Sequence, residues 1–282
     1  MSATAYTDNG TSTRQETTSG LRVWPLNRAA LLTLTVGGLI MFVVWSTAGL
    51  LFMHFLDDGP VGDADRRVVE WFEDQRTPTI NSMSYWGSML SDTFVKVGLI
   101  IVVGGAMVFV WRRWHDALYL ALAVITEATV FLFTSLVVDR ERPPVEQLDT
   151  IPPSGSFPSG HVAAAVAFYG SLFVVVCWHT RRRGVRAVFL AIAVIVPVVV
   201  ATSRMARGMH HPIDVTAGAL LGLATVLLVR IALRNGVRRI GRQVADGERT
   251  APEHTLHLDL NEPLDHTEHG VAEERLTTGG VR

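Results

Sequence analysis

The sequence SGSFPSGHVAAAVAFYGSLFVVVCW, residues 154–178, joins a short polar turn to a long apolar run. Ser159 stands where the N-cap of a helix is expected, and His161 opens the run. Gly160 between them lets a ligand approach the backbone closely. The free N–H groups and the positive dipole end of such a helix suit a phosphate. The stretch therefore predicts a membrane-buried helix with an anion site at its mouth, although a plain capped helix has the same local pattern.

Two further polar segments border apolar runs in the same way: DRERPP at residues 139–144 and SRMARGMHHPID at residues 203–214. The three segments together supply two fixed cations, a hydroxyl, two imidazoles and a carboxylate, on Arg142, Arg204, Ser159, His161, His210 and Asp214. This set suits phosphoryl transfer and lacks the spacing of metal ligands. We therefore expect a phosphoryl-transfer site that uses no metal and no other cofactor.

Hydrophobic residues make up 49% of the 282 residues, and they are concentrated in blocks. A hydrocarbon core of about 30 Å takes about 20 helical residues to cross. Six blocks are predicted to cross it: residues 29–56, 93–111, 117–138, 162–178, 187–202 and 213–229. The sequence thus predicts an all-α, polytopic membrane protein. Its fold is expected to be a six-transmembrane-helix bundle with the active site at the extracytoplasmic ends.

Arginines mark one side of this predicted bundle. They follow the second span, separate the fourth from the fifth, and follow the sixth: Arg112, Arg113, Arg181, Arg182, Arg183, Arg186, Arg234, Arg238, Arg239 and Arg242. Cytoplasmic loops carry the excess of positive residues in membrane proteins. We therefore expect a multi-pass protein of the cell membrane with both termini in the cytoplasm. The three polar segments then share the extracytoplasmic face.

The predicted membrane domain covers residues 29–233, flanked by polar segments at both ends. Residues 1–28 and 234–282 are expected to be disordered cytoplasmic tails. The charged segment 57–78 has the pattern of a short amphipathic helix on the membrane surface. A net charge of −1 without a basic patch gives no sign of a nucleic-acid partner. The expected partners are the bilayer and a lipid phosphate, and the sequence does not indicate an oligomeric state.

The chemistry is expected to centre on His210, which lies four residues before Asp214. Asp214 would sit just inside the sixth span, so its carboxylate is expected to reach one nitrogen of His210. That contact would fix the tautomer and leave the other nitrogen free to attack phosphorus. His161 would protonate the departing oxygen and then activate water.

Binding of the phosphate is assigned to groups from all three polar segments. Arg142 and Arg204 carry forked guanidinium donors that suit phosphate oxygens, and the Ser159 hydroxyl and the Gly160 N–H would assist them. A structural alternative exists for each arginine, because arginines near the ends of spans also anchor lipid headgroups. The convergence of three segments on one face favours the phosphate site.

The motifs FPSGH and SRMARGMHHPID resemble the second and third signatures of the type 2 phosphatidic acid phosphatase family, membrane lipid phosphatases related to vanadium haloperoxidases. The third keeps the spacing SR, five residues, H, three residues, D. The resemblance covers about residues 30–230 and implies a six-helix core with metal-independent hydrolysis. It also implies a phosphohistidine at His210 with Asp214 as its partner and His161 as the acid. The implied phosphate binders are Arg142, Ser159, Gly160 and Arg204.

The first signature of that family departs from its pattern here. It has a lysine, six residues, and then Arg-Pro, whereas the residue seven positions before Arg142 is Ser135. One phosphate-binding cation is therefore missing. Arg140 on the same loop is the first candidate to replace it, and Lys96, the only lysine of the chain, is the second.

The function that these residues favour is that of an integral-membrane lipid phosphatase that removes a phosphomonoester or diphosphate through a phosphohistidine. The substrate class is left open among phosphatidate, phosphatidylglycerophosphate and prenyl diphosphates. Two alternatives remain: a lipid-linked phosphotransferase with an acceptor other than water, and a catalytically inactive membrane protein that binds lipid. The presence of His161, His210 and Asp214 favours an enzyme.

Overall fold

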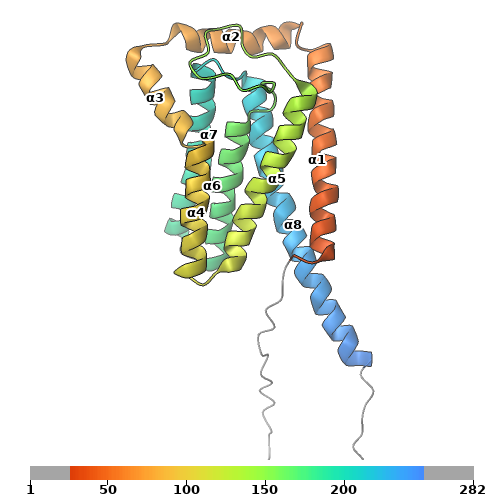
Figure 1. Cartoon of the computed structure of the whole chain (residues 1–282). Coiled ribbons are helices and arrows are strands. Elements are labelled where there is room, and N and C mark those ends of the chain that lie inside the picture. The colour runs from red at the N-terminus through yellow and green to blue at the C-terminus, as the bar shows by residue number, and fades with distance from the viewer. Residues whose placement is uncertain (1–25, 251–282) are drawn as a thin grey trace, which may run out of the picture. The chain divides into compact units, whose positions relative to one another are not determined.

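The computed structural model describes residues 26–250, with the backbone alone for residue 93 and residues 239–250. Within this range the chain is all-α, as predicted. Its helices are α1 (Arg28–Phe55), α2 (Pro60–Asp74), α3 (Pro78–Met89), α4 (Thr93–Phe109), α5 (Trp114–Val138), α6 (Gly160–His179), α7 (Arg183–Ala206) and α8 (Pro212–Thr250). Figure 1 shows their arrangement. Residues up to Gln243 belong to one compact unit, and residues 244–250 belong to a second.

Five of the described helices are long and apolar enough to cross a membrane: α1, α5, α6, α7 and residues Pro212–Arg238 of α8. The remaining predicted span, residues 93–111, corresponds to α4, which passes the same test only together with α3, across a bend of 45°. The protein is therefore a multi-pass membrane protein, and residues 26–250 contain five candidate spans, or six if α3 and α4 form one. The sequence did not predict α3.

Glycines and alanines let the helices approach closely around α6, which packs against α5 and α7 (Figure 1). A Cβ at Gly222 of α8 would lie 2.4 Å from the carbonyl oxygen of Ala163, and one at Gly218 would lie 2.4 Å from that of Ser159. Small residues at helix crossings have this role in membrane proteins, where apolar burial alone does not drive association. The close crossing brings the start of α8 against the start of α6, and the Ser159 N–H bonds to the Asp214 carbonyl at 2.9 Å.

The amphipathic helix predicted within residues 57–78 is α2, which lies across the ends of the other helices near the loop between α5 and α6 (Figure 1). Val69 and Asp65 on one side are buried, whereas Trp71 is exposed. A buried aspartate on a surface helix needs a partner, because an unpaired charge away from water is costly. Its partners belong to the candidate site.

The C-terminal boundary of the predicted membrane domain is wrong in one respect. Residues 234–250, expected to belong to a disordered tail, continue α8 as far as Thr250. An existing helix extends without a new nucleation step, and this segment is rich in arginine and other residues that tolerate helix well. At the other end Asn27 caps α1, accepting from the N–H groups of Ala29 and Ala30. The rest of the predicted tails, residues 1–25 and 251–282, lies outside the described residues.

Candidate active site

His210 lies in the turn between α7 and α8 and is only 4% exposed. Its Nδ1 is 2.8 Å from the carbonyl oxygen of Ser156 and 4.0 Å from Oδ2 of Asp214. The hydrogen bond expected between His210 and Asp214 is therefore replaced by one to Ser156. A carbonyl only accepts, so Nδ1 carries the proton and Nε2 keeps its lone pair. This contact gives His210 the tautomer that the sequence predicted, with the proton on Nδ1. The Ser156 carbonyl, and not Asp214, accepts the hydrogen bond from Nδ1.

The surroundings of His210 keep it uncharged. Burial lowers its pKa well below the usual value, and the positive charge of Arg204 lowers it further, against the opposing effect of Asp214. Arg142 and His161 also act on this pKa, so groups from all three polar segments lie around the same imidazole. A neutral imidazole is the nucleophilic form. The geometry therefore brings together the residues that the sequence assigned to one site.

Asp214 in the first turn of α8 is fully buried and makes contacts that the sequence did not predict. Its Oδ2 accepts from the backbone N–H of His211 at 2.9 Å and lies 3.3 Å from Nδ1 of the same residue. Its Oδ1 accepts from Nη1 of Arg140 at 2.7 Å. The carboxylate that was expected to pair with His210 is held by a helix-capping bond and by an arginine.

Arg140 is buried in a cluster of three carboxylates. Besides Asp214, its Nη2 lies 2.8 Å from Asp57 and 2.8 Å from Asp65, and its guanidinium stacks over the ring of Phe52 at 4.7 Å. Burial alone would lower its pKa, but the carboxylates outweigh burial and raise it. Both Nη atoms of Arg140 are engaged by acidic side chains, so they are not free for a phosphate, and the replacement of the missing lysine by Arg140 stays a prediction.

The second candidate for that missing cation, Lys96, lies on α4. It lines a small void with Ser91 and with residues of α6, among them Ala164 and Phe168. Lys96 therefore faces the neighbouring helix near the start of α6, where Ser91 Oγ donates to the carbonyl of His161 at 2.6 Å.

Four polar groups at the site are buried and have no hydrogen-bond partner among the described residues: Ser159 Oγ, Arg140 Nε, Arg142 Nε and Arg204 Nε. Arg142 is otherwise held by backbone carbonyls, with Nη1 donating to Met209 at 2.7 Å and Nη2 to Ser154 at 3.3 Å. Leaving buried donors unpaired costs free energy, about 1–3 kcal/mol for each group. Unpaired donors next to a buried histidine fit an anionic ligand.

Gly160 begins α6, but its missing side chain serves packing. A Cβ there would lie 2.6 Å from the ring of Phe131 on α5. The expectation that this glycine makes room for a ligand is therefore revised, since the space is taken by a neighbouring helix. Its N–H remains at the start of α6, where the Ser159 side chain makes no capping bond.

Acidic residues outside the three motifs were missed by sequence reasoning. Asp57, Asp65 and Asp149 look like solvated loop residues, yet each contacts an arginine near the site. The available signal was the excess of aspartates on the face that the arginine rule makes extracytoplasmic. His211 was also missed because its contact with Asp214 depends on the turn conformation.

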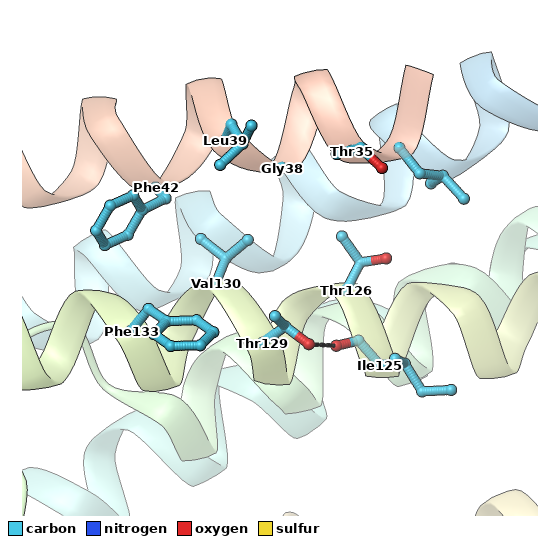
Figure 2. A pocket seen from close by; sticks show the side chains of 10 residues that line it. Thr35, Gly38, Leu39, Phe42, Ile125, Thr126, Thr129, Val130 and Phe133 are labelled. Atoms are coloured by element: carbon cyan, nitrogen blue, oxygen red, sulfur yellow. Dashed lines mark hydrogen bonds between the residues drawn. The ribbon is translucent and has the colours of Figure 1, made fainter. Parts of the chain in front are cut away.

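An apolar cavity of about 500 Å³ lies between α1 and α5, away from this site. Figure 2 shows Phe42 of α1 on one side and Thr126, Val130 and Phe133 of α5 on the other. The Thr129 hydroxyl in its wall bonds to the Ile125 carbonyl at 2.8 Å. No titratable side chain lines this cavity, so it does not suit a phosphate.

A sequence model of the PAP2 superfamily matches residues 114–238. Phosphatidylglycerophosphatase B from Bacillus subtilis (strain 168) is 29% identical over 188 residues, which cover 64% of this chain and 91% of that protein. The crystal structure of a transmembrane PAP2-type phosphatidylglycerolphosphate phosphatase from Bacillus subtilis superposes with a TM-score of 0.59 at 25% identity. The match covers 69% of this chain and 93% of that one. LpxE from Aquifex aeolicus matches with a TM-score of 0.46 at 21% identity, over 60% and 93% of the two chains.

Proposed function

We propose that the chain, whose residues 114–238 match the PAP2 superfamily model, removes a phosphomonoester or diphosphate from a lipid through a phosphohistidine at His210. The observation that carries the proposal is the buried imidazole of His210, whose Nδ1 is held by the Ser156 carbonyl, together with the unpaired donors of Ser159, Arg142 and Arg204. A phosphoryl group would satisfy Ser159 Oγ, Arg142 Nε and Arg204 Nε at once. Such donors stabilise the charge on the phosphoryl oxygens during transfer.

In the proposed first step, Nε2 of His210 forms a bond to phosphorus as the bond from phosphorus to the lipid oxygen breaks. His161, at the start of α6, donates the proton that the departing oxygen needs. The imidazole becomes positively charged, and the Asp214 carboxylate 4.0 Å from Nδ1 stabilises that charge. In the second step, His161 takes a proton from water, which attacks phosphorus and releases inorganic phosphate and the neutral His210.

The substrate class is proposed from the relatives and from the bilayer. Both Bacillus subtilis relatives are phosphatases of phosphatidylglycerophosphate by name, so this lipid stands first, beside phosphatidate and prenyl diphosphates. All three present a terminal phosphate on an apolar chain. The phosphate would reach the site from the side of the bundle while the apolar chain stays in the bilayer.

We expect purified protein in detergent to release inorganic phosphate from at least one of these lipids in the presence of excess EDTA. The nucleophile is an imidazole and the charge is neutralised by arginines, so removing divalent metal should leave the rate unchanged. Phosphate release measured by a colorimetric assay tests this, with His210→Ala as the control. Transfer to an alcohol without release to water would instead indicate a phosphotransferase, and lipid binding without turnover an inactive lipid-binding protein.

We further propose that the site faces away from the cytoplasm and that both termini are cytoplasmic. The loops that carry Arg112, Arg113 and Arg181–Arg183 lie at the opposite end of the bundle from α2 and the candidate site (Figure 1). Positive loops are retained in the cytoplasm. The membrane domain in this proposal is residues 29–233, with α8 continuing beyond it.

In a Cys177→Ser background, a cysteine at position 63 or 151 should react with a membrane-impermeant maleimide on intact cells. A cysteine at position 184 should react only after the membrane is opened. Ile151 is exposed and open space surrounds Gly184, so neither result would reflect burial within the protein. The reverse labelling pattern would place the site in the cytoplasm.

A further inference from the structure

Asp149, on the loop between α5 and α6, binds two arginines at the site. Its Oδ2 is 2.7 Å from Nη1 of Arg204, and its Oδ1 is 2.8 Å from Nε of Arg207. Arg207 is held to the same loop by the Leu148 carbonyl, which accepts from Nη2 at 2.9 Å. Arg204 Nη1 also donates to Ser88 Oγ at 2.9 Å. Asp149 therefore already engages Nη1 of Arg204, an arginine that is assigned to phosphate binding.

The Asp149 carboxylate is ionised. Burial alone would raise its pKa, but the contacts with Arg207 and Arg204 outweigh burial and hold the pKa below the usual value. One negative charge thus faces two positive ones. A phosphate that binds Arg204 must compete with this carboxylate, because both are acceptors for the same forked donor.

We infer that Asp149 determines specificity at the proposed phosphate site: its carboxylate shields Arg204 until a doubly charged terminal phosphate displaces it, and singly charged phosphodiesters fail to do so. The inference rests on the proposed function, since it takes Arg204 as a phosphate ligand. Selectivity against phosphodiesters matters in a bilayer, because its bulk phospholipids are phosphodiesters. An unshielded arginine site would bind their headgroups.

The charge of the phosphate group decides whether it displaces Asp149 from Arg204. A phosphomonoester carries close to two negative charges above its second pKa of about 6, whereas a phosphodiester carries one, the same as a carboxylate. At equal distance the attraction to an arginine scales with that charge. The dianion therefore has an advantage over Asp149 that the diester lacks.

The surroundings of Asp149 allow its side chain to move away from Arg204. Its side chain is 24% exposed, compared with 6% for that of Arg204, and residues 150–153 that follow it are all exposed. Arg204 Nε has no partner among the described residues, so a phosphate can engage this donor before the bond to Asp149 breaks. Arg207 would keep the displaced loop nearby through its bond to Leu148.

The test compares two inhibitors of lipid phosphate release: inorganic phosphate, a dianion at pH 8, and dimethyl phosphate, a singly charged diester. Wild-type protein should be inhibited by phosphate and hardly at all by dimethyl phosphate. Asp149→Asn removes the charge while its amide oxygen still accepts from Arg207. This variant should bind dimethyl phosphate about tenfold more tightly, because the diester no longer competes with a charged carboxylate for the Arg204 donors, and the preference for phosphate should shrink.

A purely structural role for Asp149 predicts something else. If the residue only held Arg204 and Arg207 in place, Asp149→Asn would weaken both inhibitors together and leave their ratio unchanged, which would overturn the inference. Glu146→Gln is the matched control, because Glu146 lies on the same loop and its side chain is 78% exposed and reaches Arg76 only at 3.9 Å, while its carbonyl bond to Arg76 survives the substitution. Its inhibitor ratio should equal that of wild type.

Two further measurements keep the outcome decisive. Asp149→Glu retains the charge and should retain the wild-type ratio, and Asp149→Ser replaces the asparagine variant if that protein is unstable in detergent, with the same expected sign. A wild-type protein that releases no phosphate from any lipid would refute the proposed function itself. Active wild type with an unchanged ratio in the neutral variants would refute the role of Asp149 alone.

Discussion

Replacing His210 with alanine is expected to lower the turnover of lipid phosphate by at least about a thousandfold, the scale on which loss of a catalytic nucleophile acts. The imidazole is buried and neutral, its Nδ1 proton is held by the Ser156 carbonyl, and its Nε2 is free to attack. No neighbouring group offers the same lone pair at the same place. Initial rates with saturating lipid in detergent measure the loss.

His211→Ala is the matched control for this experiment. His211 lies beside the nucleophile and contacts Asp214 at 3.3 Å through its side chain, but its backbone bond to Asp214 survives the substitution. We expect a much smaller loss of turnover. An inactive His211→Ala protein together with an active His210→Ala protein would show that the nucleophile had been assigned to the wrong histidine.

Replacing Arg140 with alanine is expected to destabilise the folded protein by about 3–5 kcal/mol, the usual cost of removing one partner from a buried charge cluster. Three aspartates, Asp57, Asp65 and Asp214, would lose their common cation. Unfolding in detergent measured by temperature or denaturant should show the loss. Activity should fall as well, because Asp214 would lose a contact at 2.7 Å that fixes its orientation.

Three further variants distinguish this structural role of Arg140 from phosphate binding. Arg140→Lys should be milder, since it keeps the charge but loses the fork that reaches three carboxylates. Arg66→Ala is the control, because the pair of Arg66 with Asp63 is solvent-exposed and should matter little. Ser135→Lys should not rescue Arg140→Ala. A stable Arg140→Ala protein with a raised KM and rescue by Ser135→Lys would instead support phosphate binding by Arg140.

The sequence predicted the helices that carry the site because their apolar blocks and their end signals are local. His161, His210, Asp214, Arg142 and Arg204 could be assigned because they lie within short motifs at the mouths of those helices. Their exact contacts could not. The bond from His210 to Ser156 joins residues 54 positions apart, and only the close crossing of α6 and α8 makes it possible.

The carboxylate partners of Arg140 could not be predicted from the local sequence. The position of Arg140 two residues before Arg142 suggested a second phosphate ligand, yet its partners come from α2, from the turn before α2 and from α8. Contacts of that kind span up to 83 residues and leave no periodic pattern in the sequence. The same applies to Asp149, whose arginines lie 55 and 58 residues further along the chain.

The covalent intermediate tests the central proposal most directly. Wild-type protein mixed briefly with lipid labelled on its terminal phosphate, in excess EDTA, and then denatured should carry label that acid removes and base does not, as expected for phosphohistidine. His210→Ala should carry none. Turnover by wild type without any covalent label, or with a base-labile label that persists in His210→Ala, would contradict the mechanism.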